Sequence, residues 1–151
     1  MATEQQLDFD RSQLGVEYPA GAFQVRKEDI LRYCKAIAER APVHTDEEAA
    51  RAAGHPSLLA PPTFCAMFVR AMGRPDIRLT FGRTSFHAGE ALEAHAPIYA
   101  GDTLSAATRL KEVYAKTGRS GTMAFIVWET SFTNQHGELV ASVQESFVRR
   151  D

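Results

Sequence analysis

The residue types best suited to chemistry lie in one short stretch of this sequence, between Ala36 and Asp46. Glu39 supplies a carboxylate and His44 an imidazole, on either side of a break at Ala41-Pro42. Two such groups can converge on one water molecule, so that one accepts a proton from the water while the other supplies a proton to the far side of a double bond. We therefore expect Glu39 and His44 to form the catalytic pair of an acid–base reaction.

A second feature is the segment Leu59-Ala60-Pro61-Pro62-Thr63, which leads into an apolar stretch. The start of a helix presents free backbone N–H groups, and these suit a carbonyl oxygen that gains negative charge. Together with the first stretch, this segment predicts chemistry on a thioester or a similar carbonyl compound. From the residues alone, a simpler interpretation stays open: Glu39 would be a solvated helix end, and His44 a loop residue bonded to the backbone.

The first half of the chain, which carries both features, is predicted to be helical. Apolar residues recur at i, i+3, i+4 and i+7, which predicts an amphipathic helix over 29–39 that ends before Pro42. Thr45 and Glu48 have the spacing of a capping box, in which the Thr45 hydroxyl accepts a hydrogen bond from the Glu48 N–H. Residues 63–72 are apolar on nearly every side, so the helix they form must be wrapped by other elements.

The second half of the chain is predicted to form the strands that wrap around this helix. Alternation of polar and apolar residues, or enrichment in β-branched and aromatic residues, marks the predicted strands, which are 22–26, 86–97, 104–111, 122–134 and 139–147. Short turns join neighbouring strands, so these should pair antiparallel. We expect a single α+β domain over residues 1–151, in which a long antiparallel sheet is wrapped around one central apolar helix.

Composition excludes several classes of protein. With 44% hydrophobic and 24% charged residues, the chain has the mix of a folded globular domain rather than of a disordered one. Its net charge of −2 provides no basic field for a phosphate backbone, so no nucleic-acid partner is expected. No apolar run approaches the roughly 18 residues of a membrane span, and the polar N-terminal stretch lacks the apolar core of a secretion signal. We expect a cytoplasmic protein that does not bind membranes.

Neither the cysteines nor the remaining histidines have the spacing of a metal or redox site. Cys34 and Cys65 are far apart and form no CxxC pair, so we expect buried, reduced thiols. His87 and His95 are expected on one strand face, but no third ligand stands at a suitable spacing. The sequence therefore predicts neither a metal ion nor a cofactor.

Taken in order along the chain, several motifs resemble the MaoC-like hydratase/dehydratase family. The resemblance is closest to the N-terminal domain type that also occurs in the dehydratase region of fungal-type fatty acid synthase. It extends from about Val16 to Arg149, and it is carried by the segments YCKAIAERAPVH (33–44), LAPPTF (59–64), PIYAGDTL (97–104), GRSG (118–121) and NQHGELV (134–140).

This resemblance implies a hot-dog fold that pairs side by side, as a homodimer or with a second MaoC-like chain. It also implies a reaction: reversible hydration of a 2-enoyl thioester of coenzyme A or acyl carrier protein to the (R)-3-hydroxyacyl thioester, with no cofactor. The family's catalytic Asp and His fall on Glu39 and His44. Ala41 stands in place of the family's asparagine, whereas Pro42-Val43 is retained.

Two departures from the family pattern concern substrate binding and catalysis. Glu39 is one methylene longer than Asp, which moves the carboxylate by about 1 Å. Pro61-Pro62 replaces a His-Gly pair, and since Pro62 has no N–H, the contact to the thioester oxygen would come from Thr63 or the next amide. We expect Pro62 and Thr63 to contact the thioester. Met67 and Phe68, on the central helix, would line the acyl chain.

In the expected mechanism His44 is the general base for water that attacks C3 of the enoyl chain, while Glu39 orients the water and helps to return a proton to C2. Two alternatives remain open. A non-catalytic subunit that shapes the acyl pocket of a hydratase partner would fit the Pro61-Pro62 pair and the missing asparagine. A hot-dog thioesterase would instead direct water at the thioester carbon.

Overall fold

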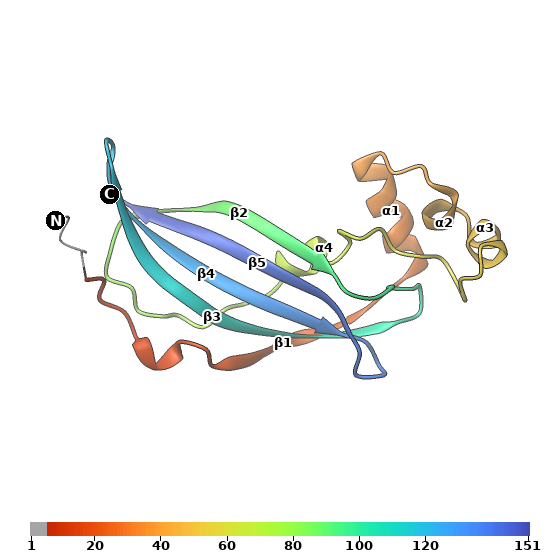
Figure 1. Ribbon diagram of the computed structural model, residues 1–151, viewed down its shortest axis with the longest axis horizontal. Coiled ribbons are helices and arrows are strands. Elements are labelled where there is room, and N and C mark those ends of the chain that lie inside the picture. Colours follow the sequence, from red (N-terminus) through yellow and green to blue (C-terminus); the bar gives the residue numbers. More distant parts are fainter. Residues whose placement is uncertain (1–5) are drawn as a thin grey trace.

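Five strands form one sheet in the computed structural model, which describes residues 6–151. The sheet order is β1-β3-β4-β5-β2, and every neighbouring pair is antiparallel (Figure 1). The strands are β1 (Glu17–Gln24), β2 (Thr84–Ala94), β3 (Thr103–Gly118), β4 (Gly121–Thr133) and β5 (Leu139–Arg150). The α+β hot-dog fold expected from the sequence is confirmed.

Strands β1, β3 and β5 are longer than the sequence pattern predicts, whereas β4 has the predicted length and β2 ends at Ala94 rather than at residue 97. Strand β1 begins at Glu17 rather than at residue 22, and β3 continues to Gly118, where a tight hairpin leads into β4. Between Leu110 and Glu112 the β3–β4 pairing contains a β-bulge. An extra residue of this kind shifts the alternation while the hydrogen-bonded ladder continues. The sequence pattern therefore ends before the strand does.

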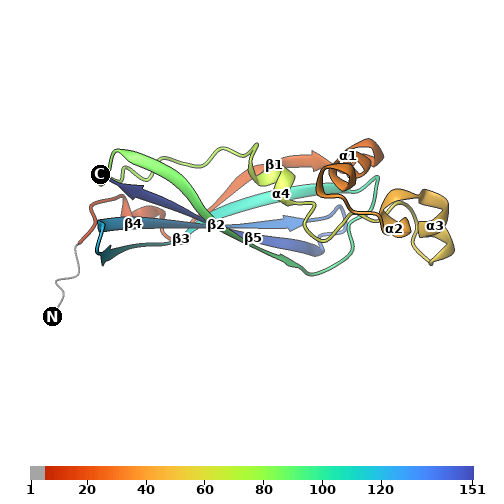
Figure 2. The same cartoon turned by 90° about the horizontal axis from the view of Figure 1, so that it is seen from above.

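Three helices gather at one end of the sheet: α1 (Lys27–Ile37), α2 (Pro42–Thr45) and α3 (Glu47–Ala52) (Figures 1 and 2). Helix α1 ends two residues earlier than predicted, because Ala38 adopts a left-handed conformation with φ of 58°. Such a residue commonly terminates a helix. Glu39 therefore lies in the connection between α1 and α2, whereas His44 lies within α2.

The predicted capping box at Thr45 is wrong. Asp46 caps α3: its Oδ1 accepts hydrogen bonds from the N–H groups of Glu48, at 2.9 Å, and Ala49, at 3.3 Å. The Thr45 hydroxyl instead donates to the carbonyl of Ala41, because Thr45 is the last residue of α2. A hydroxyl inside a helix often bonds back to the preceding turn in this way. Asp46 has the extended backbone that an N-cap requires.

The central helix is much shorter than the predicted 63–72. Only α4 (Ala66–Val69) is α-helical, and the residues around it form turns with i to i−3 hydrogen bonds, such as Phe64 N to the Pro61 carbonyl at 3.0 Å. Proline residues precede this segment, and Pro75 follows it. Each proline lacks a donor and restricts the residue before it. The wrapped segment is therefore apolar, as expected, but mostly irregular.

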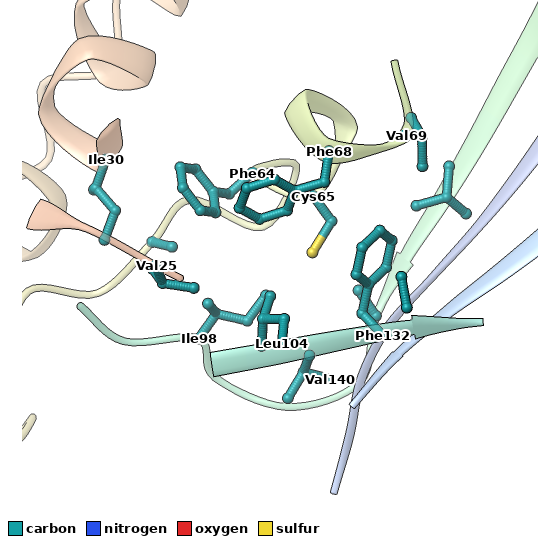
Figure 3. Close-up of a cluster of buried hydrophobic side chains, with 14 of the residues drawn as sticks. Val25, Ile30, Phe64, Cys65, Phe68, Val69, Ile98, Leu104, Phe132 and Val140 are labelled. Atoms are coloured by element: carbon teal, nitrogen blue, oxygen red, sulfur yellow. The ribbon is translucent and has the colours of Figure 1, made fainter. Parts of the chain in front are cut away.

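The main core lies between this segment and the sheet (Figure 3). Phe64 and Cys65 are completely buried, and Phe68 packs between Phe23, with ring centroids 4.6 Å apart, and Phe132. Both cysteines are free and buried, as expected, and burial raises the pKa of the Cys65 thiol to about 12. No helix within residues 6–151 is long and apolar enough to cross a bilayer.

A second core lies farther along the sheet and includes residues close to the N-terminus. Leu7 and Phe9 are buried against residues that share one apolar cluster: Ile77, Leu79, Leu110, Ala124, Ile126 and Trp128. The backbone N–H of Asp10 donates to the Ile77 carbonyl at 2.8 Å, which fastens the two segments together. The sheet is thus covered both by the α4 segment and by residues 7–9 with 77–79.

Candidate active site

His44 is held in one orientation by a hydrogen bond of its ring. Its Nδ1 lies 2.7 Å from the backbone carbonyl oxygen of Leu59. A carbonyl oxygen can only accept, so Nδ1 must carry the hydrogen, and in the neutral ring the lone pair is then on Nε2. This is the tautomer that a general base requires, with the basic nitrogen pointing away from the anchoring contact.

The loop that anchors His44 is itself fixed to the segment after β2. The Ala60 N–H donates to the Ile98 carbonyl at 2.8 Å, and the Ala100 N–H donates to the Leu58 carbonyl at 2.9 Å. The Leu59 N–H donates to the Val43 carbonyl at 3.1 Å. The Leu58–Ala60 loop therefore bridges the chain beside His44 and the chain beyond β2, which fixes the imidazole relative to the sheet.

A cavity of about 290 Å³ opens beside His44. Its wall is mostly apolar and consists of His44, Leu59, Ala60, Pro61, Pro62, Ala94, His95, Ala96, Pro97 and Ile98. A largely apolar wall with a few polar groups is typical of a site for a small organic ligand. The two imidazoles are the only side chains in this wall that commonly bind metals.

His95 is a cavity residue that sequence reasoning missed. It lies just beyond the end of β2, and its Nε2 is 2.9 Å from the Ser142 hydroxyl. The prediction that His87 and His95 lie on one face of the strand is wrong. A β-bulge between His87 and Gly89 inserts an extra residue, which shifts the alternation of side chains between the two histidines. His95 reaches the cavity only through the pairing of residues 98–100 with residues 58–60, which no local pattern indicates.

Glu39 does not line the cavity. Its Oε1 accepts hydrogen bonds from the N–H groups of Ala41 and Arg40, both at 2.8 Å. These backbone bonds, with a smaller contribution from the charge of His44, hold the pKa of Glu39 below its ordinary value. The carboxylate is therefore ionised near neutral pH, and it is better suited to stabilising a cation on His44 than to supplying a proton.

The four predicted substrate-binding residues occupy different environments. Pro62 lines the cavity. The side-chain oxygen of Thr63 lies 2.7 Å from the Tyr33 hydroxyl, which also donates to the Thr63 carbonyl at 3.0 Å. Met67 is partly buried against the main core, and Phe68 is one of its buried members. Of the four residues, only Pro62 therefore belongs to the cavity wall, whereas Thr63, Met67 and Phe68 do not.

Comparisons with known proteins agree with this fold along most of the chain. Residues 12–143 match the family described as FAS1-like, dehydratase domain region. A UPF0336 protein from Saccharopolyspora erythraea is 33% identical over 150 residues, which span 95% of this chain and 93% of the relative.

Solved structures of related proteins share the fold of this chain. A MaoC-like dehydratase superposes with a TM-score of 0.79 and 26% identity, over 92% of this chain and 42% of that longer chain. The C-terminally truncated HadBC (3R-hydroxyacyl-ACP dehydratase) complex from Mycobacterium tuberculosis superposes with a TM-score of 0.75 and 23% identity, over 92% of this chain and 98% of that chain. The chain therefore belongs to the FAS1-like dehydratase region family, and its fold is that of the MaoC-like hydratases and dehydratases.

Proposed function

We propose that this protein hydrates a 2-enoyl thioester, and dehydrates the corresponding (R)-3-hydroxyacyl thioester, with His44 as the acid–base residue. The observation that supports this most directly is the fixed tautomer of His44 beside a cavity with a mostly apolar wall. The membership of the chain in a dehydratase-region family supports the same reaction class. The acyl group would be carried by coenzyme A or by acyl carrier protein, and no cofactor takes part.

In the hydration direction, Nε2 of His44 accepts a proton from a water molecule while the water oxygen forms a bond to C3. The electron pair of the C2–C3 double bond moves toward the carbonyl, which becomes an enolate. A proton then adds to C2, and the imidazolium of His44 is the group that can return it. The ionised Glu39 stabilises this imidazolium through its negative charge.

The enolate oxygen requires a hydrogen-bond donor. Pro62 has no N–H, and the Thr63 N–H donates to no group among residues 6–151. We therefore assign the oxyanion contact to the Thr63 N–H. An oriented backbone donor that is not already engaged can stabilise developing charge without reorganisation.

The test is hydration of crotonyl-CoA by the purified chain, followed as loss of the absorbance of the conjugated enoyl thioester. In His44→Ala we expect kcat to fall by about 10²- to 10⁴-fold, because a positioned acid–base group commonly contributes that much. Glu39→Gln, which removes only the charge, should cause a smaller loss. His136→Ala, in the exposed turn before β5, is the matched control and should leave the rate unchanged.

Unchanged turnover in folded His44→Ala would exclude this mechanism. Release of free thiol from the acyl-CoA, without hydration, would instead indicate a thioesterase. Circular dichroism of each variant distinguishes loss of a catalytic group from loss of the fold.

One observation favours a second function, that of a non-catalytic subunit beside a MaoC-like partner. Glu39 lies outside the cavity, with its carboxylate bonded to its own loop. Two of the similar structures, the HadBC complex and the ChsH1–ChsH2 complex from Mycobacterium tuberculosis, are heteromeric complexes. In this case the chain alone would not hydrate crotonyl-CoA, and activity would appear only after addition of a MaoC-like chain with an intact Asp and His pair.

A further inference from the structure

We propose that His87, Glu90 and Glu145 form a binding site for a divalent transition-metal ion such as Zn²⁺, separate from the cavity beside His44. The metal-binding atoms of the three side chains all lie within 4.8 Å of one another. His87 and the cavity residue Ala94 are both on β2, about 20 Å apart along a strand that rises about 3.4 Å per residue. The proposal therefore does not depend on the proposed hydratase activity.

A β-bulge brings His87 and Glu90 to the same face of the sheet. In a regular strand, residues three apart point to opposite faces. Here His87 pairs with Phe147 and Gly89 pairs with Ser146, so Ala88 is the extra residue. Bulges of this kind commonly re-aim a side chain near functional sites. The ring of His87 then packs against Phe147, with ring centroids 5.2 Å apart and near-perpendicular planes.

The charges of this cluster are not balanced by the protein itself. Glu90 and Glu145 lie directly opposite each other on β2 and β5, an arrangement that is unfavourable for two like charges. Glu145 is only 4% exposed, and a buried carboxylate requires a partner. Arg74 pairs with its Oε1 and neutralises one of the two charges. Glu90, Glu145 and Arg74 together therefore carry one net negative charge.

The contacts of Glu145 leave one oxygen free for a cation. Arg74 engages Oε1, whereas Oε2 lies 3.2 Å from Nε2 of His87. The same Nε2 lies 4.0 Å from Oε2 of Glu90. Ligand atoms about 2.0–2.2 Å from a zinc ion are separated by similar distances in a tetrahedral site. Arg74 has the role of a residue that orients a ligand carboxylate without touching the metal.

One imidazole and two carboxylates leave a fourth position for water. Imidazole nitrogen and carboxylate oxygen together suit Zn²⁺ and related transition metals better than Mg²⁺ or Ca²⁺, which prefer oxygen ligands alone. A bound ion would connect β2 to β5 through side chains, in addition to the backbone ladder. The expected consequence is a higher melting temperature when the metal is present.

Isothermal titration of Zn²⁺ into the chelator-treated full chain tests the proposal, with visible absorbance of Co²⁺ as a second readout. We expect one ion per chain, a rise in Tm of several degrees, and the intense absorption of tetrahedral Co²⁺. Glu90→Gln should weaken binding by about tenfold or more, and His87→Ala should abolish it. His136→Ala removes a histidine from an exposed turn and should bind like the wild type.

Three results would overturn the proposal: no saturable Zn²⁺ binding to the wild-type chain, equal binding by folded His87→Ala, or a Co²⁺ spectrum without tetrahedral character.

Discussion

Glu39 illustrates how a single carboxylate acquires its role from the backbone around it. After the left-handed Ala38 ends α1, the next residues have N–H groups without helical partners, and the Glu39 side chain accepts from two of them. Hydrogen bonds to a carboxylate favour its charged form. The longer arm of Glu relative to Asp is used here to reach these N–H groups rather than the cavity.

The pH dependence of stability should therefore report on Glu39. Because its pKa is lowered in the folded chain, the ionised carboxylate contributes stability above its ordinary value of 4.5, and this contribution is lost as the pH falls through the lowered folded value. Wild type should be more stable than Glu39→Gln at pH 7, and the difference should shrink below pH 4.5. Urea unfolding at several pH values measures this. A difference that stayed constant down to acidic pH would contradict the assignment.

At the scale of elements, the short helices near His44 depend on caps rather than on length. Helix α3 has only six residues, too few to be stable without fixed ends. Asp46→Ala should remove the cap and cost about 1 kcal/mol of unfolding free energy. Thr45→Ala should cost less than about 0.5 kcal/mol, because the Thr45 hydroxyl makes only a bond back to the preceding turn. Denaturant titration of both variants shows which residue caps α3. Equal losses of unfolding free energy in the two variants would contradict the assignment to Asp46.

The α4 segment should matter through its aromatic packing. Phe64 is completely buried and has edge contacts with Tyr33 and Phe68. Phe64→Ala should cost about 3–5 kcal/mol, the usual range for a buried phenylalanine. Phe86→Ala is the matched control, because Phe86 is 41% exposed, and its cost should be below about 1 kcal/mol. Thermal unfolding by circular dichroism provides the comparison. Similar losses for the two variants would show that the α4 segment is not the centre of the core.

The sequence predicts those features of the fold that depend on nearby residues. The burial of Leu104 follows from alternation, and the strand that contains Phe132 follows from its enrichment in β-branched and aromatic residues. The bulge at Ala88 and the pairing of 58–60 with 98–100 depend on partners far along the chain. For this reason the second cavity imidazole could not be predicted. The buried Glu145 was missed because alternation in β5 does not reveal a carboxylate with a distant arginine.

On the scale of the whole molecule, β2 is an edge strand of the sheet and most of its residues are exposed. A long uncovered edge is a template for pairing with another strand. We expect two chains of 16.7 kDa to associate through this edge into one continuous sheet. Light scattering during gel filtration should report about twice the chain mass, and β2 amides should be protected from hydrogen exchange. A monomeric mass with rapid exchange in β2 would instead indicate that a different MaoC-like chain is needed.

The direction of the chain through the molecule has a practical consequence. The C-terminus lies at the end of the sheet opposite α1, α2 and α3 (Figure 1). The cavity beside His44 lies near those helices, because His44 is part of α2. A fluorescent protein or an affinity tag joined to the C-terminus would lie at the other end of the sheet from the cavity. Immobilisation through that end should therefore leave the site open to a bulky thioester.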